Sequence, residues 1–264
     1  MPAFFRVHPC AARRATAAIV LSLVSSIGVS SLASESVELE QPLEILPGSP
    51  TVRADRLAEY STTTAWGGQR LVAGKLNGRK TLNLINTVDA GESPMIDHIV
   101  LDASTLALMN RYSPYFAVGP HYLAVAVRDR RLTGSLNSIP GGESVAIDTA
   151  LASDVFEEST LALVLAALPL AEGYSGRLPR LAVSASNSSF STGSVDFTVT
   201  GREQVEGGDG QAYRCWVVEA QWSGVDYSEI HWIAEVPPYS IRKKATFPDG
   251  RQRESGFVTV STER

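Results

Sequence analysis

The chain has 264 residues, 23 basic and 28 acidic side chains, and a net charge of −5. This balance argues against non-specific nucleic-acid binding, which is typical of proteins with a basic stripe. It also leaves no polybasic segment for an anionic membrane surface.

Residues 1–33 have the organisation of a secretory signal peptide. Three arginines form a basic start, residues 16–32 are apolar with interspersed serines, and Ala33 ends a small-residue cleavage site. The apolar stretch is too short and too interrupted to favour a membrane anchor that is retained. We therefore expect a periplasmic or secreted protein after cleavage at Ala33, with Arg13-Arg14 leaving open whether export is general or twin-arginine.

Cleavage at that site changes the composition of the chain. It removes three arginines, which leaves 20 basic and 28 acidic residues, and it removes Cys10. Cys215 then has no partner for an intrachain disulfide, so the core must supply the stability. Its mid-strand position is typical of an inert thiol. Residues 34–52 are acidic and carry three prolines, which predicts a flexible leader before one β-rich domain at 53–264.

Strand signals dominate the predicted domain. Asn77-Gly78 between two strand-like segments is the strongest hairpin signal in the chain. No helices alternate with the strands, so a parallel βαβ fold is not expected. The expected strands are residues 69–76, 79–87, 95–103, 121–128, 131–136, 180–186, 194–201, 211–222, 227–236, 239–247 and 257–262.

The segment 213–222 alternates with a period of two residues. Trp216, Val218 and Trp222 fall on one face, and the next predicted strand repeats the pattern around Trp232. This alternation is what an antiparallel sheet with one packed face requires.

One helix is expected, because the run from Leu161 to Leu168 contains no polar residue. Asp154, with Glu157 three residues later, predicts a capping box, and Pro169 ends the helix. Eight residues span about 12 Å at about 1.5 Å per residue, far less than the hydrocarbon core of about 30 Å. A helix that is apolar on every side is expected to be buried, so we predict that it fills the concave side of the sheet.

The sequence contains no strong catalytic or metal-binding motif. His98, His121 and His231 are far apart, and none has a second ligand at metal-binding spacing. They are expected at the surface or at a sheet rim, and no metal or cofactor is expected. The segment Gly173-Tyr174-Ser175-Gly176 follows a helix and lacks the last glycine of a nucleophile elbow. The serine-rich residues 184–194 predict a polar strand edge and turn.

Residues 145–150 resemble the Asp-Thr-Ala loop of retroviral-type aspartic proteases, with Asp148 as the carboxylate. That chemistry needs two aspartates that share a proton, and the usual small-residue turn does not follow here. A short strand that ends in a turn explains the segment equally well. Asp148 is the only sequence support for a hydrolase.

Several segments between roughly residues 96 and 253 carry recognisable motifs: Asp102-Ala103-Ser104-Thr105-Leu106, Ser153-Asp154-Val155-Phe156, residues 161–170 with Gly173-Tyr174, and residues 199–205, 212–218, 230–234 and 237–243. In this order and spacing they resemble an exported bacterial family, domain of unknown function 3108. The resemblance implies an antiparallel half-barrel wrapped around a helix, similar in shape to periplasmic carriers of lipoproteins. Leu108 replaces a usual proline and residues 207–210 replace a usual turn, and the family's uncharacterised activity transfers no functional residue.

The predicted fold class is α+β and mostly β, with a curved antiparallel sheet, a half-barrel, around one apolar helix. Such a layout often leaves a groove, so the first hypothesis is a non-enzymatic protein that binds a lipid, an acyl chain or a lipoprotein-like ligand. The alternatives are an envelope assembly partner that uses exposed strand edges, and a hydrolase. The predicted groove residues are Leu161, Val164, Leu165, Leu168, Trp216, Val218, Trp222 and Trp232.

Overall fold

The computed structural model describes residues 52–64, 67–88, 95–113, 123–137, 144–184 and 189–261. All of them lie in one compact unit, Gln41–Arg264. The predicted signal peptide 1–33, nearly all of the predicted leader 34–52, and His121 lie outside the described residues. The predicted domain boundaries and the cleavage site therefore remain predictions.

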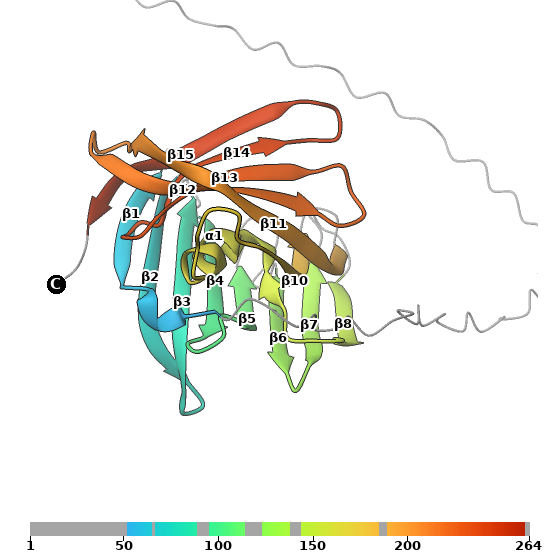
Figure 1. Ribbon diagram of the computed structural model, residues 1–264. Coiled ribbons are helices and arrows are strands. Elements are labelled where there is room, and N and C mark those ends of the chain that lie inside the picture. Colours follow the sequence, from blue (N-terminus) through green and yellow to red (C-terminus); the bar gives the residue numbers. More distant parts are fainter. Residues whose placement is uncertain are drawn as a thin grey trace, which may run out of the picture. The chain divides into compact units, whose positions relative to one another are not determined.

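Within these described residues, fifteen strands form one hydrogen-bonded sheet in the order β8-β7-β6-β5-β4-β3-β2-β1-β15-β14-β13-β12-β11-β10-β9. Every ladder is antiparallel except β9–β10, and β1 and β15 join the two halves (Figure 1). The strands are β1 Tyr60–Thr64, β2 Gly67–Leu76, β3 Arg79–Val88, β4 Met95–Asp102, β5 Leu108–Ser113, β6 Leu123–Arg128, β7 Arg131–Asn137, β8 Ser144–Ala150, β9 Phe156–Glu157, β10 Ser175–Ser184, β11 Ser189–Glu206, β12 Ala212–Trp222, β13 Ser228–Ala234, β14 Ser240–Thr246 and β15 Gln252–Ser261.

This architecture confirms the predicted fold class, a mostly β fold with a curved sheet around one short helix. The predicted hairpin is also confirmed. Leu76 pairs with Arg79, and Asn77 and Gly78 have φ angles of 50° and 80°. Positive φ at both central residues is the two-residue turn whose twist matches the flanking strands, which is why Asn-Gly fixes this register.

The two-residue strand β9 is not predicted by the pattern, and neither are the longer strands β1 and β5. Tyr60 and Thr62 of β1 are buried, as are Leu108 and Met109 of β5. Both strands carry polar side chains on buried positions, and β5 also contains Arg111. Polar residues at inward positions remove the apolar alternation by which such strands are recognised.

The helix α1 spans Leu161–Ala166 and is preceded by the 3₁₀ helix η2, Glu158–Thr160. Together they cross from β9 to its parallel neighbour β10. The predicted capping box is wrong. Asp154 is exposed and lies 3.7 Å from Arg130, whereas Glu157 ends β9 and accepts a hydrogen bond from Ser159 N at 2.8 Å. Pairing of β9 with β10 holds Glu157 in extended backbone, so it caps η2 and not a longer α-helix.

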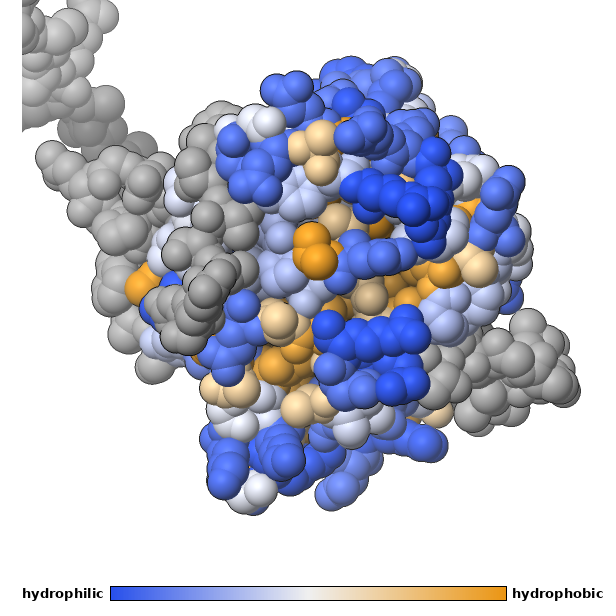
Figure 2. Space-filling view, turned by 60° about the vertical axis from the view of Figure 1, so that its left-hand side comes forward, coloured by the Kyte–Doolittle hydropathy of each residue, from blue (hydrophilic) through white to orange (hydrophobic). Residues whose placement is uncertain are grey.

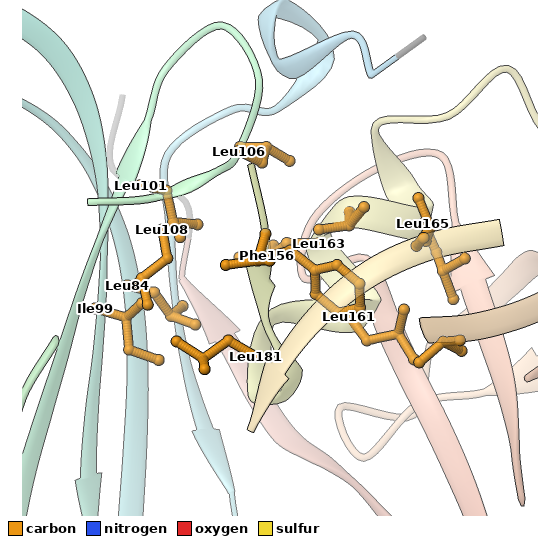
Figure 3. Packing of buried hydrophobic residues seen from close by; sticks show 14 of the residues in the cluster. Leu84, Ile99, Leu101, Leu106, Leu108, Phe156, Leu161, Leu163, Leu165 and Leu181 are labelled. Atoms are coloured by element: carbon orange, nitrogen blue, oxygen red, sulfur yellow. The ribbon is translucent and has the colours of Figure 1, made fainter. Parts of the chain in front are cut away.

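The main hydrophobic core surrounds α1. Leu161 and Leu165 are 2% and 0% exposed, and they belong to one buried cluster with residues of β3, β4, β5 and β10 (Figure 3). The prediction that the apolar helix is buried is therefore confirmed. No helix in the described part of the chain has the length and hydropathy needed to cross a bilayer.

A second, smaller core lies on the other face of β12–β15. It contains Cys215, Trp232, Ile241 and Phe257. Burial raises the pKa of the Cys215 thiol to about 11, so this thiol is protonated and unreactive at neutral pH.

Candidate functional site

A cavity of about 850 Å³ lies between the start of α1 and the strands β13–β15. Ligand sites for small molecules measure about 300–1,000 Å³, so the cavity could hold one ligand with a single chain. Its lining is mixed, with apolar residues from α1 and β3 and a charged group from β13–β15. On one face of the molecule, apolar surface lies in recesses between hydrophilic residues (Figure 2).

Strand register explains why polar side chains reach this interior. His231 of β13 pairs with Val218 on one side and with Lys243 on the other. Val218 belongs to the main core and is fully buried. Residues directly opposite in a ladder share a face, so His231 and Lys243 lie on the same face as the core. Glu229 lies two residues before His231 and shares that face.

Glu229 is the centre of this polar group and is 5% exposed. Its Oε1 accepts hydrogen bonds from Tyr227 Oη at 2.6 Å and from Lys243 Nζ at 2.8 Å. Its Oε2 lies 2.8 Å from His231 Nε2. We call Tyr227, Glu229, His231 and Lys243 the Glu229 cluster; all four line the cavity.

The Glu229 cluster keeps its central carboxylate ionised. Burial raises the pKa of Glu229, but the hydrogen bonds and charges of His231 and Lys243 outweigh burial and hold that pKa at about 2. Burial together with Glu229 raises the pKa of Tyr227, which therefore remains a hydroxyl donor. An ionised carboxylate has only acceptors, so His231 Nε2 must carry the hydrogen that it shares with Glu229.

The pKa of Glu229 should make the fold sensitive to acid. A carboxyl group with a pKa of about 2 when folded and 4.5 when exposed stabilises the fold above pH 4.5. That stabilisation, on the order of 3 kcal/mol, is lost as the pH falls from 4.5 toward 2. Urea unfolding between pH 7 and pH 3 should show a smaller loss for Glu229→Gln than for wild type. Equal losses would contradict the assignment.

Two buried polar atoms beside this cluster have no hydrogen-bond partner among the described residues: His231 Nδ1 and Trp222 Nε1. His231 and Trp222 are 2% and 3% exposed, and both line the cavity. The Trp222 ring packs edge-on against Tyr227 with 4.8 Å between centroids. Buried polar groups are nearly always paired, so these two atoms mark a place where a bound molecule could supply the missing partners.

A second buried charge network lies at another wall of the cavity. Arg111 donates to both carboxylate oxygens of Asp97 at 2.9 Å each, and to Glu157 Oε1 at 2.5 Å. Burial raises the pKa of Glu157, although Arg111 opposes that change. Arg111 thus links β4 and β5 to β9 through buried ion pairs, so we assign it a role in stabilising the fold.

The structure places the eight predicted groove residues in three different surroundings. Only Leu161 and Trp222 line the cavity. Val164, Leu165, Leu168 and Val218 are buried in the main core, and Trp216 packs against it. Trp232 pairs directly with Val217 and lies in the second core, on the opposite face of the sheet. The other seven predicted groove residues belong to the main core or pack against it, and Trp232 does neither.

The prediction for His231 as a surface or rim residue is wrong, because His231 is buried. His98 is half-buried, and its Nε2 lies 3.0 Å from Asn83 Oδ1. The signal for the missed residues was present in β13, where Glu229, His231 and Ile233 alternate with Trp232. Both faces of β13 are buried, and the face with Glu229 and His231 is the one that lines the cavity.

Asp148 lies on β8 and is exposed. Its two carboxylate oxygens accept hydrogen bonds from Arg131 at 2.5 Å and 2.7 Å. The bond with Arg131 lowers the pKa of Asp148, and both carboxylate oxygens bond that arginine, whereas the protease chemistry needs a second carboxylate that shares a proton. The segment is a strand of the sheet, as the simpler reading of its sequence predicts.

No family model matches the sequence, and no curated protein matches it. The solved structures that are similar to this chain include two with 12% sequence identity each. The beta-barrel-like protein of domain of unknown function DUF1849 from Brucella abortus has a TM-score of 0.40, covering 78% of this chain and 96% of its own. The hypothetical lipoprotein YmcC from Escherichia coli has a TM-score of 0.30, covering 79% of this chain and 89% of its own. Such similarity does not assign a family, and the resemblance to domain of unknown function 3108 stays a prediction.

Proposed function

We propose that this protein is a non-enzymatic binding or carrier protein that holds one amphiphilic molecule with an acyl-like chain in the cavity beside α1. The observation that carries the proposal is the cavity of about 850 Å³, which adjoins the buried core and has both an apolar and a charged wall. The predicted signal peptide would place this activity in the periplasm.

The apolar wall suits a hydrocarbon chain. It includes Leu84, Leu161 and Leu163, from β3 and α1. Transfer of a methylene group from water to such a wall contributes about 0.8 kcal/mol, so a chain of moderate length would bind without specific polar contacts. Leu165 and Leu168 do not line the cavity. The helix therefore fills the core with one side and leaves space at its start.

Extraction of gently purified protein tests the proposal. The protein, exported and purified without detergent, should release a stoichiometric amphiphile into organic solvent, and mass spectrometry should identify it. Protein that is folded but yields an empty extract, and that binds no added single-chain amphiphile, would contradict the proposal.

A variant that fills the cavity gives a matched comparison. Ala162 is half-buried and lines the cavity, whereas Ala166, one turn further along α1, is half-buried and does not line it. We expect Ala162→Phe to reduce the co-purified ligand strongly and Ala166→Phe to retain it. Cooperative thermal unfolding of both variants would show that the loss reflects occupied space and not a damaged fold.

A further inference from the structure

We propose that the charged wall of the cavity binds an oxyanion head group, a carboxylate or a phosphate, between Lys243 and Arg253. This inference rests on the proposed carrier function and names the chemical class of its ligand. The ligand would then be a single-chain anionic amphiphile, with its chain against α1 and its acidic head at β14 and β15.

The register of β14 and β15 brings the two cations together. Lys243 pairs with Ser255, and Arg253 lies two residues before Ser255 on the same strand. Residues that are diagonal across a ladder lie about 7–8 Å apart, and the long side chains of Lys243 and Arg253 can converge on one group. Both residues and Ser255 line the cavity. A hydroxyl donor thus lies between two cationic side chains.

The pairing of charged side chains at the cavity leaves Arg253 available for an anion. Glu229 carries one negative charge and forms an ion pair with Lys243. Its charge therefore does not neutralise the second cation, Arg253. Arg253 forms no ion pair with any described residue. Of the other acidic residues in the lining, Glu158 bonds Arg180 at 2.7 Å, and Glu254, whose side chain is on the other face of the sheet, lies 3.8 Å from Arg242.

The remaining charges of the lining are also accounted for. Glu157 is held by Arg111, which in turn bonds Asp97. These groups lie on β4, β5 and β9, so they do not neutralise Arg253 on β15. Lys243 is 40% exposed at its side chain, which leaves its ammonium group able to turn toward a ligand while Glu229 keeps the bonds from Tyr227 and His231.

One of the two unpartnered buried atoms fits the same ligand. Trp222 Nε1 can only donate, so an oxyanion would give it the acceptor that the described residues lack. His231 Nδ1 is an acceptor while Nε2 carries the ring hydrogen, so it does not contribute to the anion site. Hydrogen bonds between charged groups and an oxyanion are about twice as strong as neutral ones, so head-group selectivity should be measurable.

Calorimetry with probes of equal chain length tests the inference. Delipidated mature protein should bind dodecyl phosphate and dodecanoate at least about tenfold more tightly than dodecanol, because the head gains charge-assisted bonds. Arg253→Met should reduce the anionic affinity toward that of dodecanol and leave dodecanol binding unchanged. Lys244→Met is the matched control, since Lys244 pairs with Glu254 on the other face of the same strands. It should leave both affinities unchanged.

The possible failures are distinguishable. Equal binding of dodecyl phosphate and dodecanol would overturn the head-group inference and keep the carrier function. Inorganic phosphate that binds as tightly as dodecyl phosphate, with the same loss in Arg253→Met, would keep the anion site and overturn the carrier function. Absence of binding by every probe would overturn both. Arg253 has no ion pair with described residues, so Arg253→Met should leave the fold intact. The comparison of Arg253→Met with Lys244→Met therefore tests the anion site even if a Lys243→Met protein fails to fold.

Discussion

Replacing Arg111 by methionine should lower the free energy of unfolding by about 3–5 kcal/mol. Arg111 is 14% exposed at its side chain and joins two carboxylates, Asp97 and Glu157, which are 11% and 2% exposed. Without the guanidinium group, two carboxylates remain buried near one another without a counter-charge. Urea unfolding at pH 7 measures the loss, and part of it should disappear at lower pH as Glu157 takes up a proton.

The exposed pair of Arg131 and Asp148 is the control for this prediction. It has the same two-bond geometry between arginine and aspartate, but its side chains are 58% and 59% exposed. Solvent screening limits such a pair to about 0–1 kcal/mol. If Arg131→Met costs as much as Arg111→Met, then burial is not the source of the effect and the network around Arg111 is not a structural centre.

Replacing Leu165 by alanine should destabilise the fold by about 2–5 kcal/mol. Leu165 is 0% exposed in α1, at the centre of the main core. The rest of the core cannot collapse into the vacated volume without moving strands of a continuous sheet, so a cavity would remain. Thermal or urea unfolding measures the loss.

Val225→Ala removes apolar atoms at an exposed turn and is the comparison for Leu165→Ala. Val225 is 49% exposed, so its truncation should change stability by no more than about 0.5 kcal/mol. Because Leu165 does not line the cavity, the Leu165→Ala protein should still prefer dodecyl phosphate to dodecanol. A similar small change for both variants would mean that α1 is not the centre of the core.

Local sequence signals predicted the parts of the fold that depend on local chemistry. Asn77-Gly78 set a hairpin register, and the apolar run after Thr160 gave the buried helix. The alternation around Val218 correctly separated the two faces of β12. Each of these depends on a few adjacent residues whose backbone or burial preference is strong.

The candidate site could not be predicted in the same way. Alternation within β13 separates Trp232 from His231, but it does not say which face meets the core, because that depends on the register with β12. Val217 opposes Trp232 in the ladder, and this pairing places Trp232 in the second core. Glu229 and Lys243 are far apart along the chain and become partners only through the ladder of β13 and β14.

The strand order also has a consequence for how the chain folds. Strands that are neighbours in the sheet also follow one another in the chain, with one exception, the pair of β1 and β15. There Ser61 pairs with Ser261, about 200 positions away. If a linker joined β15 to β1 and the chain were opened between β8 and β9, the strands would follow one another in sequence without interruption. The native connectivity is thus a circular permutation of a simple ladder. Its slowest step should be closure of the β1–β15 seam, because that pairing alone must overcome the entropy of a long loop.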